Sequence, residues 1–400
     1  MVNSKMLGLG KKSSVIREIF EYGKKRKSEI GANKVFDFSL GNPSVPSPKE
    51  VNEALCDLIS GMDATALHGY TSAPGDMNVR RAIADYISTT HGVCEKAENI
   101  YLTVGAAASL TISLNAILNE GDEVIVFAPF FPEYRVFVEK AGGTLVTVKC
   151  RESDLQPDLD LLGKSITYKT KAVIINSPNN PTGAVVREDT IKKIAELLDE
   201  KSKEYGSEIF IISDEPYREL VYDKDTFVPY IPKYYANTIV CYSFSKSLSL
   251  PGERIGYVLV SDGCTDKEDI FYAICGAGRS LGYVCAPALF QYLIPKVLGK
   301  TSDIEIYRKN RDILYSALVS YGYRAVKPDG AFYLFVKSPE GDAKKFCERA
   351  RNYELLLVPS DDFGYPGYVR ISYCVATDMI EASLSAFEKL IKEYEGYEQA

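Results

Sequence analysis

Lys246 has the clearest chemical signature in this chain of 400 residues, because it ends the sequence Ser243-Phe244-Ser245-Lys246 and precedes Arg254 by eight positions. A lysine amine can form a Schiff base with a carbonyl group, and serine and arginine side chains can bind a phosphate. Two further polar segments lie upstream, Asn179-Asn180-Pro181-Thr182-Gly183 and Asp214-Glu215-Pro216-Tyr217. Each of the three segments directly follows an apolar, strand-like run, so we expect all three at one edge of one sheet.

Short apolar runs alternate with helical patterns between about residues 100 and 260, which is typical of a buried parallel sheet covered by helices. The runs are 124–128, 172–176, 209–213, 238–242 and 257–260, and the clearest helices are 106–119, closed by Gly121, and 186–204. Ligands of such α/β sheets bind beyond the carboxyl ends of the strands. This rule brings together the residues that follow the runs: Phe131, Asn180, Asp214, Tyr217, Ser243 and Lys246.

The segment after about residue 300 changes character and predicts a second, α+β domain. It contains a charged helical pattern at 303–319, strand patterns at 331–336 and 369–373, and an amphipathic helix from Asp378. A further helix is expected over 13–30, before a proline-rich extended segment at 43–48.

Composition excludes several classes of function. The net charge of -7 is spread along the chain and does not suggest a nucleic-acid partner. Two histidines and no Cys-x-x-Cys leave no material for a zinc site or a histidine-based triad, so no metal is expected. Nine scattered cysteines indicate a reducing compartment, and no signal peptide or apolar span is visible, so we expect a cytoplasmic protein without membrane contact.

The polar residues at the predicted sheet edge fit a cofactor with an aldehyde, a basic ring nitrogen and a phosphate, which is pyridoxal 5'-phosphate. The chain resembles the fold-type I, class I/II aminotransferases of the aspartate aminotransferase superfamily over nearly its whole length. The motifs that carry the resemblance are Ser39-Leu40-Gly41-Asn42-Pro43, Tyr70 before Pro74-Gly75, Ser177 to Gly183, Asp214-x-x-Tyr217, Ser243-x-x-Lys246 with Arg254-x-Gly256, and Val369-Arg370-Ile371-Ser372.

The resemblance implies a large cofactor-binding domain over 46–299 with a mostly parallel sheet of the seven-stranded type. The smaller α+β domain would combine an N-terminal arm, 1–45, with residues 300–400. It also implies that Lys246 holds the cofactor as an aldimine, that Asp214 pairs with the pyridine nitrogen, and that Asn180 and Tyr217 bind the ring 3'-oxygen. Without the resemblance, Asp214 and Lys246 could form a buried ion pair, and Asn180 could be a turn residue before a proline.

The phosphate is expected at Gly105, Ala106 and Ala107, where a tight glycine turn opens a helix whose first N–H groups face an anion. Close packing of the helix is the alternative interpretation of these small residues. Many members of the family have a hydroxyl residue here, so the side-chain contacts must come from other residues: Ser243, Ser245, Arg254 and, from a second subunit, Tyr70.

Phe131 matches the aromatic residue that stacks on the pyridine ring, although Phe130 could take this role. Arg370 matches the arginine that binds the substrate α-carboxylate, beside the backbone of Gly41. Arg279 is close to the position where relatives specific for dicarboxylates present a second arginine from the partner subunit, and a surface arginine is its alternative. Asn42 is a further candidate for substrate contact or, alternatively, a turn residue.

These observations predict a homodimeric aminotransferase with shared active sites. It would move an amino group between an L-amino acid, with aspartate and glutamate favoured and aromatic residues as alternatives, and a 2-oxo acid by a ping-pong mechanism. A C–S β-lyase or an aspartate β-decarboxylase on the same fold remains open, because the motifs fix the cofactor and not the reaction. A non-catalytic effector-binding domain is disfavoured, since we expect residues 1–35 to hold one short helix at most and no DNA-binding helix pair.

Overall fold

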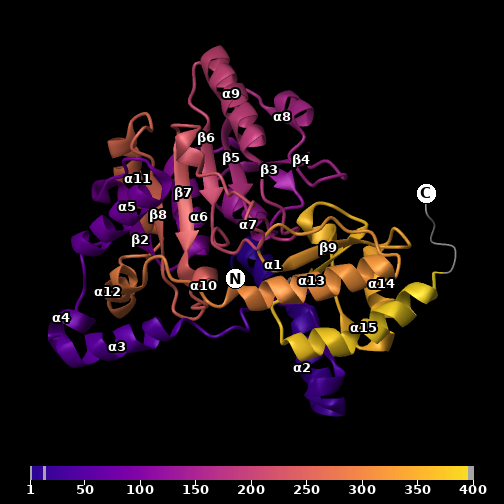
Figure 1. The fold of residues 1–400 in the computed structure, drawn as a ribbon. Coiled ribbons are helices and arrows are strands. Elements are labelled where there is room, and N and C mark those ends of the chain that lie inside the picture. Colours follow the sequence, from indigo (N-terminus) through magenta and orange to yellow (C-terminus); the bar gives the residue numbers. More distant parts are fainter. Residues whose placement is uncertain (1, 12–14, 395–400) are drawn as a thin grey trace.

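A seven-stranded sheet forms the centre of the computed structural model, which describes residues 2–11 and 15–394 (Figure 1). The strand order is β2-β8-β7-β6-β5-β3-β4. The strands are β2 (Ile100–Thr103), β3 (Glu123–Ala128), β4 (Thr144–Lys149), β5 (Thr170–Asn176), β6 (Phe210–Asp214), β7 (Thr238–Ser243) and β8 (Gly256–Val260). The expected mostly parallel sheet is confirmed, but β8 runs antiparallel to both of its neighbours. The connection from β7 to β8, residues 244–255, contains the single helical turn α10 (Phe244–Ser247) and returns the chain antiparallel to β7.

Helices cover both faces of this sheet, which explains why its strands are apolar on both sides. In β3, Val124 and Val126 pack in one buried cluster, and Ile125 and Phe127 pack in another on the opposite face. The first face is covered by α6 (Ala106–Ile117), α7 (Glu133–Lys140) and α11 (Lys267–Ser280). The second is covered by α5 (Met77–His91), α8 (Leu159–Ser165), α9 (Glu188–Tyr205) and α12 (Ala288–Val297). Helix α6 ends earlier than expected, so Gly121 lies in the turn that follows and does not close the helix.

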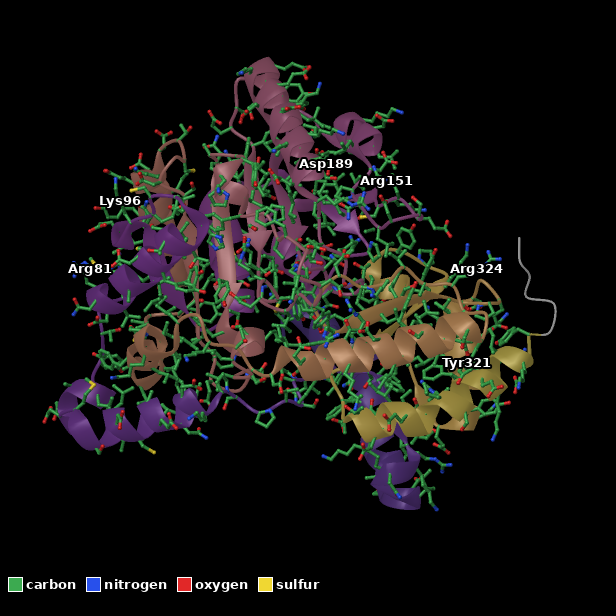
Figure 2. The ribbon with its side chains drawn as sticks, viewed as in Figure 1. Arg81, Lys96, Arg151, Asp189, Tyr321 and Arg324 are labelled. Carbon is green, nitrogen blue, oxygen red and sulfur yellow. The ribbon has the colours of Figure 1, made fainter. Side chains whose placement is uncertain are left out.

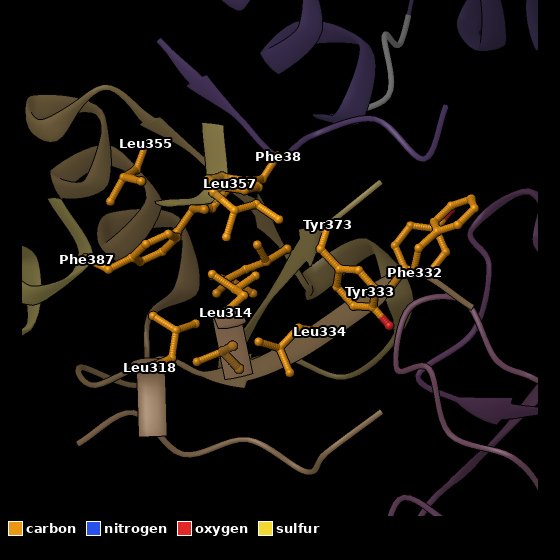
Figure 3. Packing of buried hydrophobic residues seen from close by; sticks show 14 of the residues in the cluster. Phe38, Leu314, Leu318, Phe332, Tyr333, Leu334, Leu355, Leu357, Tyr373 and Phe387 are labelled. Carbon is orange, nitrogen blue, oxygen red and sulfur yellow. The ribbon is translucent and has the colours of Figure 1, made fainter. Parts of the chain in front are cut away.

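The C-terminal part forms a second body beside the sheet (Figure 1). It contains the antiparallel sheet β11-β12-β9 and the parallel pair β1-β10. Its elements are β1 (Phe36–Asp37), β9 (Tyr333–Lys337), β10 (Leu355–Leu356), β11 (Val358–Pro359), β12 (Tyr368–Ser372), α13 (Ile304–Ser320), α14 (Ala343–Ala350) and α15 (Thr377–Lys392). Figure 3 shows Phe38 packed among Leu355, Leu357 and Phe387. The segment after β1 therefore shares a core with the C-terminal helices, and the division at residues 45 and 299 stays a prediction.

Among the described residues before β1 lie the α-helices α1 (Ser4–Lys11) and α2 (Val15–Ile30), so the expectation of one short helix at most was wrong. Positions 13 and 14 of the helix expected over 13–30 lie outside the described residues. The other helices are α3 (Lys49–Gly61), α4 (Ala64–His68), α10 (Phe244–Ser247) and the 3-10 turns η1 (Ala32–Lys34), η2 (Ala97–Asn99), η3 (Ile231–Lys233), η4 (Arg351–Tyr353) and η5 (Asp361–Phe363).

Charged side chains lie mainly on the outside, as Arg81, Lys96 and Asp189 illustrate at the periphery of the ribbon in Figure 2. Among the helices that the structure describes, none is both long and apolar enough to span a bilayer. Figure 1 places the end of β7 and α10 beside the second body, and the candidate site lies at this junction.

Candidate active site

A cavity of about 320 Å³ lies where the carboxyl ends of β5, β6 and β7 meet α6 and the second body. It brings together most of the residues that the sequence predicted for the site. These are Gly41, Ala106, Ala107, Phe131, Asn180, Asp214, Tyr217, Ser243, Ser245, Lys246, Arg254 and Arg370. The predicted Gly105 does not line the cavity but lies next to Arg254, which does. Asn42, Tyr70 and Arg279 do not line the cavity either.

Lys246 reaches the cavity from α10, the single helical turn that follows β7. Its Nζ donates a hydrogen bond of 2.7 Å to the Gly41 carbonyl, and no ion pair joins it to Asp214. Burial is the main cause that lowers the pKa of Lys246 to about 8; Cys374 opposes the shift, and the positive charges of Arg254 and Arg370 contribute to it. An amine that is partly neutral near physiological pH can attack a carbonyl carbon and carry a proton.

Asp214, the last residue of β6, has one engaged and one free carboxylate oxygen. The Tyr134 hydroxyl donates a 2.5 Å hydrogen bond to Oδ2, whereas Oδ1 is buried without a partner. Burial raises the pKa of Asp214 to about 7, while the Tyr134 hydrogen bond lowers it and the nearby Glu215 raises it. A buried carboxylate oxygen without a partner is unfavourable unless a ligand donates to it. Oδ1 is therefore suited to a protonated ring nitrogen.

Hydrogen-bond donors gather at the other end of the cavity, where α6 begins. Gly105 has φ of 95°, and a Cβ at this position would lie 2.7 Å from Nη2 of Arg254. Arg254 is itself in the left-handed region, with φ of 54°, and its Nη1 lies 3.5 Å from Oγ of Ser245. The Ser243 hydroxyl in turn donates to Ser245 at 2.8 Å. The guanidinium, the two hydroxyls and the first N–H groups of a twelve-residue helix together suit a phosphate.

Arg370 reaches the cavity from β12 and carries a buried charge that no carboxylate balances among residues 2–11 and 15–394. Its Nη1 donates to Oδ1 of Asn180 at 3.1 Å, and its Nη2 donates to the Ser39 carbonyl at 2.5 Å. Its Nε is buried without a partner, and the Tyr333 ring lies 4.8 Å from Cζ. Burial lowers the pKa of Arg370, because the charged guanidinium is unfavourable away from water. A bound carboxylate would offset this cost.

Several residues at the site were not predicted, among them Tyr134, Tyr333 and Ile16. Tyr134 lies at the start of α7, just after the end of β3, so the same strand-end rule could have found it. The Tyr333 hydroxyl lies 2.9 Å from that of Tyr217, but Tyr333 belongs to β9, and no local signal brings this strand to the cavity. Ile16 lines the cavity from α2.

The structure separates two aromatic candidates, since Phe131 lines the cavity while Phe130 is 3% exposed in the core. Tyr70 is 95% exposed, and Arg279 is exposed in the last turn of α11. In one chain these two residues have no role at the cavity, so any contribution must be to a second copy.

The family model of aminotransferase class I and II matches residues 33–387. The chain belongs to this family. A probable aspartate aminotransferase of Methanocaldococcus jannaschii is 30% identical over 389 residues, which are 95% of this chain and 98% of that protein. An aromatic-amino-acid aminotransferase of Thermococcus litoralis is 28% identical and covers 95% of this chain and 96% of its own. A crystal structure of an aminotransferase from Eubacterium rectale is 55% identical with a TM-score of 0.97, and it covers 98% of this chain and 99% of its own.

This aminotransferase thus has the enzyme class and fold that the sequence predicted, and members of its family depend on pyridoxal phosphate. Its residues fit that group in two places. The free Oδ1 of Asp214 suits the pyridine nitrogen, and the cradle that a Cβ at Gly105 would fill suits the phosphate.

Proposed function

We propose that this aminotransferase binds pyridoxal phosphate at Lys246 and moves the amino group of an L-amino acid onto a 2-oxo acid in a ping-pong cycle. The observation that carries the proposal is the buried, uncompensated Arg370 in the same cavity as the Lys246 amine and the free oxygen of Asp214. An amino acid and a 2-oxo acid share a carboxylate next to the reacting carbon. One arginine can therefore orient both substrates of the cycle.

The bound cofactor supplies an aldehyde carbon and a pyridinium ring that withdraws electrons from the substrate Cα. Asp214 would keep a proton on the ring nitrogen through its free Oδ1. Phe131 would cover the ring, and Asn180 and Tyr217 would bind its 3'-oxygen. With its lowered pKa, Nζ of Lys246 would accept the proton from Cα of the amino acid and deliver it to the carbon that was the aldehyde, and the second half-reaction would run this transfer in reverse. Arg370 would orient the substrate so that the Cα–H bond stands across the ring.

The phosphate is assigned to the N-terminus of α6, at Gly105, Ala106 and Ala107. Its side-chain contacts are assigned to Ser243, Ser245 and Arg254. Tyr70 is assigned to the phosphate of a second subunit by its place before Pro74-Gly75, and its 95% exposed side chain is accessible for that contact. On this assignment the active enzyme is a homodimer with shared sites.

Aspartate and glutamate are the favoured donors, with aromatic amino acids as alternatives. The names of the relatives from M. jannaschii and T. litoralis support both classes. Arg279 of the second subunit would bind the distal carboxylate, and Gly41 and Asn42 would lie beside the substrate. A cytoplasmic location stays a prediction from the scattered cysteines, all nine of which are free.

The test is the visible spectrum of the enzyme with pyridoxal phosphate before and after L-aspartate, L-tyrosine or L-alanine is added without an acceptor. Conversion of the cofactor to its amine form, with one equivalent of the 2-oxo acid released, is the expected result for the preferred donor. Release of ammonia and pyruvate from a thioether amino acid would instead support a β-lyase. Formation of alanine from aspartate without an acceptor would support a β-decarboxylase.

A further inference from the structure

The segment 39–41 provides a backbone oxygen to each of two cations in the cavity. The Ser39 carbonyl accepts from Nη2 of Arg370 at 2.5 Å, and the Gly41 carbonyl accepts from Nζ of Lys246 at 2.7 Å. The two hydrogen bonds are separate: the Ser39 carbonyl orients Arg370, and the Gly41 carbonyl, two residues further on, accepts from Lys246.

The side chain of Asp37 fixes this segment at the place where its strand pairing stops. Phe38 still donates its N–H to the Leu356 carbonyl at 3.1 Å, but β1 has already ended at Asp37. The next N–H, that of Ser39, is 3.1 Å from Oδ1 of Asp37, and the Ser39 hydroxyl donates to the same oxygen at 2.6 Å. Ser39 is fully buried. Asp37 therefore replaces the missing strand neighbour and holds the residue whose carbonyl orients Arg370.

Asp37 is held in turn by α2. Nζ of Lys27 donates to Oδ2 of Asp37 at 2.7 Å, and the Asp37 side chain is only 8% exposed. The helix approaches closely at Gly23, where a Cβ would lie 3.0 Å from the same Oδ2. A separate anchor of α2, the ion pair from Arg26 to Glu354, does not touch Asp37. The structure thus offers a matched control for loosening the helix without disturbing the carboxylate.

We propose that Asp37 is a positioning residue for substrate binding: it holds the Ser39 carbonyl, and through it the guanidinium of Arg370, in the orientation that receives the substrate carboxylate. The inference rests on the proposed function, because it needs Arg370 to bind that carboxylate. The hydrogen bonds from Asp37 end at Ser39, away from the residues assigned to the cofactor ring and phosphate. Its loss should therefore weaken the binding of amino acids and 2-oxo acids and leave cofactor binding intact.

The experiment compares Asp37→Ala, Asp37→Asn and Ser39→Ala with the control Arg26→Gln in the cofactor-loaded enzyme. For Asp37→Ala we expect KM for both the amino acid and the 2-oxo acid to rise about tenfold with kcat changed less than about threefold, the size expected for loss of a charge-assisted contact. Asp37→Asn keeps an oxygen acceptor for Ser39 and should recover much of the loss. Arg26→Gln should stay near the wild type. Ser39→Ala, which retains the backbone bond, should be intermediate and provides the answer if Asp37→Ala does not fold.

Two binding measurements accompany the kinetics. Calorimetry with succinate, a dicarboxylate that does not react, should show the same tenfold loss for Asp37→Ala, and titration with pyridoxal phosphate should show no change. Equal losses of cofactor and succinate affinity, or equal losses in Asp37→Ala and Arg26→Gln, would reduce Asp37 to a general structural role and overturn the inference.

Arg370→Ala separates this inference from the proposed function. If Arg370→Ala leaves KM and succinate affinity unchanged, the assignment of Arg370 is wrong and the role of Asp37 is wrong with it. If Arg370→Ala raises KM and weakens succinate binding while Asp37→Ala changes neither KM nor succinate affinity, only the positioning role of Asp37 is refuted.

Discussion

In the cofactor-free protein, Asp214→Asn should become progressively more stable relative to the wild type as pH rises from 5 to 8, and it should abolish transamination. Burial holds the pKa of Asp214 at about 7, above its ordinary value of 3.8, so folding favours the protonated form. The stability from this group is fully present below the unfolded pKa and is lost as pH rises through the folded pKa. A rise from 3.8 to about 7 corresponds to a loss of about 4 kcal/mol, at about 1.4 kcal/mol per pH unit between pH 4 and pH 7. An asparagine cannot ionise and does not suffer this loss.

The assay is chemical denaturation of both proteins without cofactor, at one protein concentration, at intervals from pH 5 to pH 8.5. The unfolding free energy of Asp214→Asn minus that of the wild type should increase by ~2 to 3 kcal/mol between pH 5 and pH 8 and then become constant. The fixed effect of the substitution, including the new amide, cancels when the same difference is compared across pH. A difference that does not change with pH would refute the reasoning, because Asp214 would then be ionised in the folded protein without penalty.

Three further substitutions test separate parts of the site. Lys246→Ala should abolish transamination and the borohydride-stable attachment of pyridoxal phosphate, and turnover at the wild-type rate would contradict the assignment. Tyr134→Phe removes the donor to Oδ2 of Asp214 and should weaken cofactor affinity by ~1.5 to 3 kcal/mol in a spectroscopic titration. Its control, Tyr235→Phe, loses a buried hydroxyl that donates to the Ile209 carbonyl outside the cavity and should bind the cofactor normally. Arg279→Ala should lower kcat/KM for dicarboxylates by ~2 to 4 kcal/mol with little change for tyrosine, and equal losses for both would exclude a role in specificity.

Much of the site was predictable because it follows from strand ends. Asn180 and Lys246 come shortly after a strand that is buried on both faces, Asp214 is the last residue of such a strand, and the geometry of a parallel sheet brings these positions together. Tyr333 could not be found in this way, since it reaches the cavity from a different sheet whose placement depends on long-range packing. Arg370 also lies in that sheet and was identified only through the resemblance.

Two features of the fold escaped prediction for local reasons. The antiparallel direction of β8 leaves no trace in its apolar run, because a strand covered on both faces looks alike in either direction. Helix α1 contains Gly8 and Gly10, which are poor helix formers, and none of its residues is buried, so neither helix propensity nor a core-facing side marks it.

The reversal between β7 and β8 has a consequence for which small molecules the enzyme can hold. Lys246 and Arg254, assigned to opposite ends of the cofactor, both lie on this one connection, and two of its residues, Ser249 and Arg254, have φ of 52° and 54°. Non-glycine residues persist in this conformation only where the surroundings fix the backbone. The connection therefore holds Lys246 and Arg254 at a fixed separation. An aldehyde whose phosphate lies nearer to or farther from its reactive carbon could then bind either Lys246 or Arg254 well, but not both at once.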